Sequence, residues 1–333
     1  VFQNAEACLR NVEHIHVPSL ASIMCQKAWC LMEQGFFQRA FEEIQKAINL
    51  LGSESLHYAH WYAFNASCNF SRKVGLYVKA KENALKAIEF ADGLGLEQQK
   101  ALSERELGIL LSATGDYQNA QELLLKANMH EIRKGMRYQA LENLLHQGEL
   151  HLASGNVGEA RGYLRESLKQ LHLRKHTALM RSLDSNSKLE LEEGNIDKSL
   201  QLAHEAIELT RLRGAKYYEA RALVTLGRIH LAKDELDVSY KHLADAIKLA
   251  RSHMAYSTQL TALAFLGELN LKQERYETAY GWLNLVLEHE SAEFWVKEKA
   301  RELIANVEKP RDGHADKTIS AKLTLDQAVA ELV

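Results

Sequence analysis

The sequence repeats itself with a period of about 40 residues, and this repeat restricts the possible folds more than any other feature. Each copy contains a turn signal, which is glycine in the first five copies and Asp234 or Glu274 in the last two. The turn residues lie at positions 35, 75, 115, 155, 194, 234 and 274. Because the interval is 40 residues five times and 39 residues once, the pattern predicts seven copies of one structural unit.

Small side chains recur at three fixed places in each copy. Seven residues before the turn stand Ala28, Cys68, Gly108, Gly148, Ser187, Gly227 and Gly267. Five residues after it stand Ala40, Ala80, Ala120, Ala160, Ser199, Ser239 and Ala279, and twelve after it stand Ala47, Ala87, Ala127, Ser167, Ala206, Ala246 and the larger Val286. Two antiparallel helices approach to about 8–10 Å only where their side chains are short. We therefore interpret each copy as a helical hairpin whose helices A and B cross at these residues.

A large apolar residue follows each turn by two positions and is expected to fill the wedge where helix A turns into helix B. These residues are Phe37, Tyr77, Tyr117, Val157, Ile196, Leu236 and Tyr276. Only two prolines occur, Pro18 and Pro310, and the chain between them is rich in good helix formers. The apolar stripe of one hairpin cannot be buried alone. The sequence therefore predicts an all-α solenoid of seven stacked hairpins over residues 18–290.

This order of small residue, glycine turn, large apolar residue and two further small residues resembles the tetratricopeptide repeat. The resemblance covers about residues 20–290 and implies a right-handed TPR-like α-solenoid. Two departures are that the period exceeds the usual value of about 34 residues and that no proline closes helix B. Both imply longer B helices, which are expected to end at glycine caps such as Gly52, Gly93, Gly135 and Gly214.

Lengthened repeats of this kind also resemble the sensor superhelices of bacterial signal-transduction ATPases, including the maltose-regulon activator, and the peptide-receptor superhelices of quorum-sensing regulators. The resemblance does not extend to the carboxylate clamp with which some tetratricopeptide domains hold chaperone tails. Of the clamp residues only one asparagine is matched, at Asn69, while Glu106 and Glu142 stand where an anion would be held. We therefore reject that assignment.

The segments outside the seven hairpins have separate interpretations. Residues 1–17 are expected to form helix B of a partial preceding repeat, residues 291–308 a terminal capping helix, and residues 309–333 a linker followed by a short C-terminal helix. The first residues contain neither an initiating methionine nor the basic start of a secretion signal. We expect the chain to be a piece of a longer protein.

No motif in the sequence would carry catalysis. The chain lacks the phosphate loop GxxxxGK[ST], HExxH, GxSxG, and GxGxxG after a strand. Closely spaced histidines, such as His57 with His60, lack the clustered cysteine or acidic partners of a metal site. We therefore expect no enzymatic activity, no cofactor and no bound metal.

Charge and composition bear on the class of partner. The formal net charge of -3 provides no global field for nucleic acid or a membrane surface. No apolar run approaches the roughly 18 residues that cross a bilayer, and the four cysteines, which lack CxxC spacing, favour buried thiols in a reduced compartment. We expect a cytoplasmic protein that binds neither membrane nor nucleic acid directly, although basic residues on the inner wall leave RNA as an alternative.

In tetratricopeptide repeats helix A lines the concave wall, and the resemblance implies that this wall holds the ligand. The wall of the second and third repeats carries side chains that could hydrogen-bond an extended peptide backbone: Tyr62, Asn65, Asn69, Arg72 and Arg105. In the fifth and sixth repeats four cations surround one acid, a set suited to carboxylate or phosphate: Arg181, Asp184, Lys188, Arg221 and Arg228. Glu149 lies on the wall of the fourth repeat. The alternative is a solvated wall whose charges form intramolecular pairs.

These patterns predict a non-catalytic superhelix that binds a protein or peptide segment, or a small-molecule effector, as the sensor or interaction module of a larger regulatory protein. The alternative is a static scaffold that binds protein partners through its convex face. Three tryptophans could serve such contacts, although packing between repeats is the other explanation for them: Trp61, Trp282 and Trp295.

Overall fold

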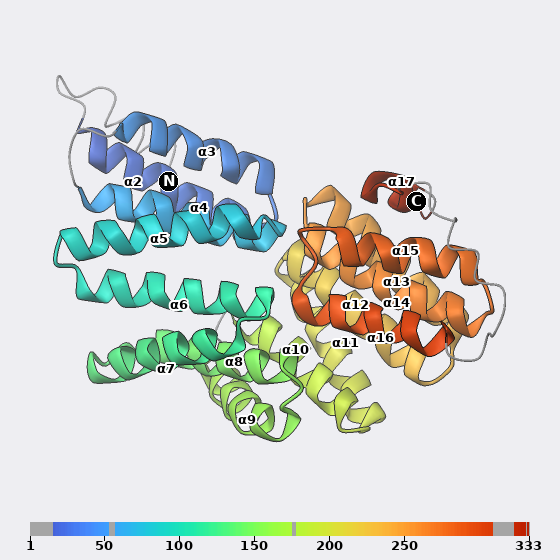
Figure 1. Cartoon of the computed structure of the whole chain (residues 1–333). Helices are drawn as coiled ribbons and strands as arrows, with labels where there is room; N and C mark the ends of the chain where they lie inside the picture. Colours follow the sequence, from blue (N-terminus) through green and yellow to red (C-terminus); the bar gives the residue numbers. More distant parts are fainter. Residues whose placement is uncertain (1–15, 53–56, 175–177, 309–322, 331, 333) are drawn as a thin grey trace. The chain divides into compact units, whose positions relative to one another are not determined.

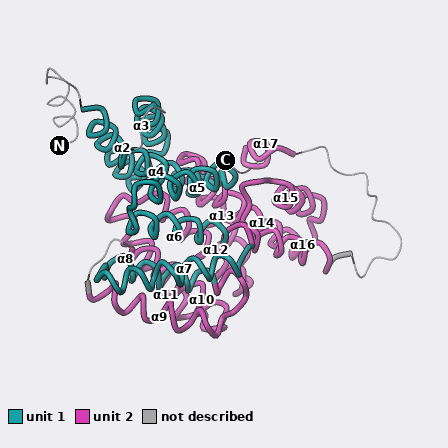
Figure 2. The backbone as a smooth tube through the Cα atoms, turned by 60° about the vertical axis from the view of Figure 1, so that its left-hand side comes forward, with its two compact units in different colours: residues 1–112, 116–150 teal, residues 113–115, 151–333 magenta. Residues whose placement is uncertain are grey.

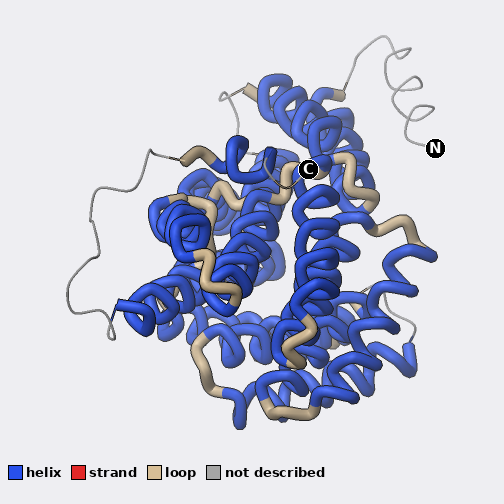
Figure 3. Tube along the Cα trace, turned by 90° about the vertical axis from the view of Figure 1, so that its right-hand side faces the viewer, coloured by secondary structure: helices blue, strands red, loops and turns tan. Residues whose placement is uncertain are grey.

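The computed structural model describes residues 16–52, 57–174, 178–308, 323–330 and 332. In this part of the chain every regular element is an α-helix, as Figure 1 and Figure 3 show. The all-α prediction is therefore confirmed. No helix within these ranges is long and apolar enough to span a membrane. The helix expected over residues 1–17 falls almost entirely outside the described residues.

The helices alternate between the A and B type along the chain. The A helices are α2 (Val17–Glu33), α4 (Tyr58–Val74), α6 (Glu97–Thr114), α8 (Arg137–Ala153), α10 (Leu179–Glu192), α12 (Lys216–Ala232) and α14 (Tyr256–Lys272). The B helices are α3 (Phe37–Leu51), α5 (Tyr77–Gly93), α7 (Tyr117–Arg133), α9 (Val157–Arg174), α11 (Ile196–Leu212), α13 (Leu236–Ser252) and α15 (Tyr276–Glu288). Two more helices follow, α16 (Phe294–Glu308) and α17 (Leu325–Ala330). Every B helix begins at the large apolar residue that the repeat places after the turn.

The turn after each A helix explains the repeated glycine. In the second hairpin Gly75 has a φ of 92°, and the N–H of Leu76 donates to the carbonyl oxygen of Ser71 at 2.7 Å. This bond closes a Schellman motif, which needs a left-handed residue and therefore favours glycine. Asp234 and Glu274 have φ values of 61° and 60°, so they adopt the same conformation although each carries a side chain.

The B helices α7 and α11 end in the same way, at Gly135 and Gly214, where the N–H groups of Met136 and Ala215 donate to the carbonyl oxygens of Glu131 and Thr210. Gly52 after α3 also has a positive φ, but its ψ of -156° differs from that of the left-handed turn. One expected cap needs a correction. Gly93 is the last residue of α5, and the left-handed position is taken two residues later by Gly95, with a φ of 65°. The prediction of Gly93 was wrong because two glycines stand close together at this helix end and only backbone geometry selects between them.

The chain divides into two compact units, which Figure 2 colours separately. Unit 1 comprises residues 1–112 and 116–150, and there α2 packs against α3 and α4, and α4 against α5. The crossing residues of its three complete hairpins are buried, as the packing argument requires: Ala28, Ala40, Ala47, Cys68, Ala80, Ala87, Gly108, Ala120 and Ala127. A Cβ added at Gly108 would lie 3.2 Å from the carbonyl oxygen of Ala120, so the backbones of α6 and α7 lie within contact distance of each other.

Unit 2 comprises residues 113–115 and 151–333. Its A helices pack in sequence, α10 against α12, α12 against α14, and α14 against α16. Since α16 also packs against α15, it covers the last hairpin in the way that the next A helix would. The crossing residues of the three complete hairpins of this unit are buried as well: Ser187, Ser199, Ala206, Gly227, Ser239, Ala246, Gly267, Ala279 and Val286.

Among the described residues, two tryptophans and two cysteines belong to the packed interior. Trp61 and Trp282 are buried, as are Cys25 and Cys68. Cys30 is exposed, contrary to the expectation of buried thiols. It follows the crossing residue of α2 by two positions, which is about 200° around the helix, so it points away from the hairpin partner.

Candidate ligand-binding surface

The predicted wall of unit 1 begins with an aromatic group on α4. Tyr62 is half-buried and stacks on Trp61, with the ring centroids 5.8 Å apart and the planes inclined by 13°. Burial raises the pKa of Tyr62 to about 12. The indole N–H of Trp61 donates to Ser103 Oγ at 2.8 Å, and Ser103 in turn donates to Asn65 Oδ1 at 3.4 Å. Asn65 is therefore held in a chain of buried contacts between α4 and α6.

Glu106 on α6 collects the other polar groups of α4. Asn69 Nδ2 and an Nη2 atom of Arg72 each donate to Glu106 Oε2 at 3.2 Å. Burial alone would raise the pKa of Glu106, but the charges of Arg72 and Arg105 and the bond from Asn69 outweigh it and hold the pKa at about 2. Glu106 stands where a carboxylate clamp would hold an anion. It is ionised instead, and it pairs with Arg72, a residue predicted to bind the ligand.

Arg105 is also engaged inside unit 1. Its Nη1 donates to Glu131 Oε1 at 2.9 Å, and Asn143 of α8 donates to the other carboxylate oxygen at 3.2 Å. Glu131 is completely buried, and burial raises its pKa although Arg105 lies beside it. Glu149, farther along α8, lies 3.6 Å from a ring nitrogen of His146. Arg72 and Arg105 thus form ion pairs within the protein, as the alternative to a ligand contact predicts.

In unit 2 the structure brings the predicted acid and cations together on two neighbouring A helices. Asp184 of α10 is buried, and it accepts a bond of 2.7 Å from Lys188 Nζ and one of 2.6 Å from Thr225 Oγ1 on α12. Burial would raise the pKa of Asp184, but Lys188 and Arg221 together lower it below its ordinary value. Asp184 therefore stays a carboxylate and holds α10 to α12.

Arg228 lies one repeat after Lys188, on α12. Its Nη2 donates to Glu192 Oε1 at 2.7 Å, and its guanidinium carbon lies 4.7 Å from the ring centroid of Phe265 and 5.7 Å from that of Trp295. Cations stack favourably on aromatic faces at such distances. Glu192 is on α10, Phe265 on α14 and Trp295 on α16. Arg228 thus connects four helices of unit 2 and is fixed in place.

Arg181 and Arg221 occupy equivalent places 40 residues apart, on α10 and α12, and both are half-buried. The structure therefore gathers the five predicted residues of unit 2 on adjacent helices. Whether they bind a ligand stays a prediction, as it does for the residues of unit 1.

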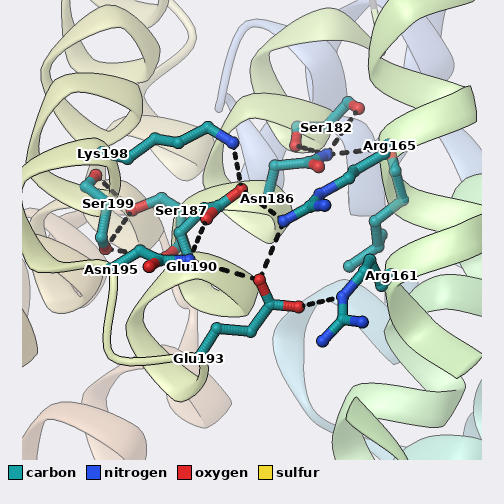
Figure 4. A network of polar contacts seen from close by, with 11 residues as sticks. Arg161, Arg165, Ser182, Asn186, Ser187, Glu190, Glu193, Asn195, Lys198 and Ser199 are labelled. Atoms are coloured by element: carbon teal, nitrogen blue, oxygen red, sulfur yellow. Dashed lines mark hydrogen bonds and ion pairs between the residues drawn. The ribbon is translucent and has the colours of Figure 1, made fainter. Parts of the chain in front are cut away.

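A second polar network lies on another side of α10 and is structural (Figure 4). Glu190 accepts bonds from Arg165 of α9 at 3.2 Å and from Lys198 of α11 at 2.5 Å. Asn186 donates to the carbonyl oxygen of Leu164, again on α9. These residues connect α10 to α9 and α11 and not to α12. The network therefore holds α10 in the solenoid from the side opposite its candidate binding residues.

Sequence patterns did not point to several residues of the candidate surface, and they assigned Trp295 only to convex-face contacts or to packing between repeats. Thr225 and Glu192 were missed because nothing in their spacing shows which partner they meet. The repeat places Phe265 on an A helix, but because the residue is apolar it was not predicted to belong to a ligand-binding wall. Trp295 lies beyond the last repeat, so the register does not predict that it reaches an A helix at Arg228. In the described ranges no three His, Cys, Asp or Glu side chains gather as metal ligands would.

Comparisons with known proteins identify the fold. No protein-family model matches the sequence, and no curated protein sequence matches it. A Rap protein complexed with competence and sporulation factor matches with a TM-score of 0.66 at 15% identity, covering 91% of this chain and 80% of that one. NprR in complex with its cognate peptide NprX matches with a TM-score of 0.57 at 14% identity, covering 86% and 83%.

A third solved structure, a signal transduction ATPase with a tetratricopeptide repeat sensor from Pyrococcus horikoshii, matches with a TM-score of 0.50 at 15% identity. That match covers 83% of this chain and 42% of the ATPase. At these identities the likeness concerns the fold alone. Together with the repeat, the Schellman turns and the buried crossing residues, it establishes that this chain is a tetratricopeptide-like α-solenoid.

Proposed function

We propose that this chain is a non-catalytic module that binds a protein or peptide segment on its A helices. The observation that carries the proposal is a contrast between two sets of positions in the repeat. The crossing positions named above are buried, and all of them except Val286 carry small side chains. The wall positions differ from repeat to repeat, and in unit 2 they place Lys188 and Arg221 beside the buried Asp184, with Arg228 near Lys188 and paired with Glu192. Packing accounts for the first set but does not require the second.

The matched structures support a peptide or protein segment as the ligand and a regulatory role for the module. The Rap protein was solved with competence and sporulation factor, and NprR with its cognate peptide. In the archaeal ATPase the tetratricopeptide repeats form a sensor. We infer that this chain is likewise the sensor or interaction part of a larger regulatory protein in the cytoplasm, with a small-molecule effector as a further class of ligand.

The proposal that the module has no catalytic activity has its own support. Several charged side chains of the wall form ion pairs that connect neighbouring helices, for example Arg72 with Glu106 and Arg228 with Glu192. General acid–base or nucleophilic catalysis needs such groups aimed at a shared reacting atom. Binding needs only that they meet the ligand.

Photocrosslinking distinguishes binding on A helices from binding elsewhere. A phage-displayed random peptide library is selected on the full chain, and the recovered peptides are tested on two variants that carry a photoreactive phenylalanine analogue. One variant has it at Glu192 on the A helix α10, and the other at Met129 on the B helix α7; both side chains are exposed. We expect crosslinks at position 192 only. Failure to recover any saturable binder, or crosslinks confined to position 129, would contradict the proposal.

A second candidate function, a scaffold that uses its B helices, has one observation in its favour. On α7 the apolar residues Leu125, Met129 and Ile132 are spaced by four and three positions, so they share one face of the helix. They are exposed by 38%, 58% and 63%. Crosslinks from position 129 to a protein partner would support this function.

A further inference from the structure

We propose that Lys188 and Arg228 together form a recognition site for one carboxylate of an acidic peptide segment. The inference rests on the proposed function, because it assigns the ligand chemistry of the same A-helix surface. The two residues occupy equivalent places in consecutive repeats, 40 positions apart, on helices α10 and α12, which pack against each other.

Both side chains have hydrogen-bond donors to spare. In the described part of the chain Lys188 Nζ makes one hydrogen bond, to Asp184, and the guanidinium of Arg228 makes one, to Glu192. A lysine ammonium has three N–H donors and a guanidinium has five. The side chains are 21% and 11% exposed, so neither is sealed in a closed core.

The local charges favour an additional anion. Burial lowers the pKa of Lys188, and the cations Arg221 and Arg228 lower it further, against the attraction of Asp184. Arg221 and Arg228 therefore repel Lys188, although Asp184 is bonded to Lys188 and the half-exposed Glu192 is bonded to Arg228. Like charges in a partly dehydrated place destabilise each other. A bound carboxylate would offset this repulsion.

Arg228 is also held ready to bind. Its stacking on Phe265 and Trp295 and its bond to Glu192 leave the guanidinium little freedom before a ligand arrives. A donor that is already ordered loses less conformational entropy on binding. A planar guanidinium can donate two parallel hydrogen bonds to a carboxylate, and the ammonium of Lys188 can add a third from the neighbouring helix.

A single acidic side chain fits this arrangement better than a nucleic acid does. Nucleic acids are held through rows of phosphates, which require a row of uncompensated cations and produce steep salt dependence. Here the cations form one compact group, and the chain as a whole carries a formal net charge of -3. A phosphorylated side chain shares the anionic chemistry, so the experiment must distinguish the two.

Three degenerate pools of fluorescein-labelled octapeptides provide the test. They share the same random flanking residues, limited to Ala, Ser, Gly and Leu, and differ only at the fourth position, which is Glu, Gln or phosphoserine. Fluorescence anisotropy measures their binding to the wild type, to Lys188→Met and to Arg228→Gln. Lys241→Met, which removes an exposed cation from the B helix α13, is the matched control.

We expect the wild type and Lys241→Met to bind the Glu pool about tenfold more tightly than the Gln pool. Each of the two site variants should reduce this preference to less than threefold while it leaves binding of the Gln pool unchanged. Circular dichroism and the thermal midpoint report folding of each variant. Arg228→Lys keeps the charge and should restore part of the preference if one site variant does not fold.

The outcomes separate this inference from the proposed function. Equal binding of the Glu and Gln pools to the wild type would overturn the carboxylate site but leave a peptide-binding module. A preference for Glu that persists in both site variants would place the anion elsewhere, and tighter binding of the phosphoserine pool would reassign the pair to a phosphopeptide. Absence of binding by any pool would count against both.

Discussion

Ser187 and Ser199 exchange hydrogen bonds where helices α10 and α11 cross. Ser187 Oγ donates to the carbonyl oxygen of Ser199 at 2.8 Å, and Ser199 Oγ donates to the carbonyl oxygen of Ser187 at 2.7 Å. In the next hairpin Ser239 Oγ donates to the carbonyl oxygen of Gly227 at 2.8 Å. The requirement for small side chains therefore also brings backbone carbonyls within reach of hydroxyl groups on the partner helix.

Removing either hydroxyl of this pair should destabilise unit 2 slightly. Alanine fits sterically at position 199, since Ala40, Ala80 and Ala120 occupy the equivalent place in other hairpins. We therefore expect Ser187→Ala and Ser199→Ala to cost about 1 kcal/mol each, the usual net value of one hydrogen bond. Urea unfolding of both single variants and the double variant measures the coupling between them. A stabilised single variant would show that the hydrogen bonds contribute nothing net.

Gly227 should tolerate no larger residue, because the facing side chain leaves no room. A Cβ added at this position would lie 2.6 Å from Leu243 Cγ, and Leu243 is completely buried. We expect Gly227→Ala to destabilise the protein by about 1–3 kcal/mol, the cost of overpacking a core. The thermal midpoint and urea unfolding measure the change.

Gly162 is the matched control for that substitution. It lies inside helix α9, where an added Cβ meets nothing within 4 Å. Since alanine has the higher helix propensity, Gly162→Ala should stabilise the protein by about 0.5–1 kcal/mol. Equal effects at the two glycines would mean that propensity, and not helix contact, decides both.

The left-handed turn at Glu274 should be relieved by glycine. Its φ of 60° costs a residue with a Cβ about 1–2 kcal/mol relative to glycine, and five other repeats have glycine at this place. We expect Glu274→Gly to raise the free energy of unfolding by about 1 kcal/mol. Gly194→Ala, in an equivalent turn with a φ of 77°, should lower it by a similar amount. A destabilising Glu274→Gly would show that the glutamate side chain contributes more than the strain it introduces.

The crossing residues and turns could be predicted from the sequence because they depend on neighbours within one hairpin. Gly108 meets Ala120 twelve positions later, and that spacing recurs in every copy. A periodic pattern therefore contains both members of each contact.

Side-chain pairing across the repeats was not predictable in the same way. The register placed Asn69 and Arg72 on the A-helix wall, but their shared partner Glu106 is 37 and 34 residues away, which is not a whole repeat. Likewise Trp295 meets Arg228 from a helix outside the seven hairpins. Position on a helix face follows from periodicity, whereas the choice of partner depends on how two helices are rotated against each other.

Glu106 should give unit 1 a measurable acid sensitivity. Its pKa is about 2 in the folded chain, against 4.5 for an ordinary glutamate, and the group is buried. The ionised form therefore contributes about 3 kcal/mol of stability above pH 4.5, and this contribution is lost as the pH falls from about 4.5 towards 2. In Glu106→Gln we expect urea unfolding at pH 7 to show a loss of about 3 kcal/mol, and the difference from wild type to shrink towards zero near pH 2.

Glu122→Gln, at an exposed position of α7, is the control and should stay within about 0.5 kcal/mol of wild type throughout. A difference between Glu106→Gln and wild type that does not vary with pH would mean that folding does not shift the pKa of this carboxyl group.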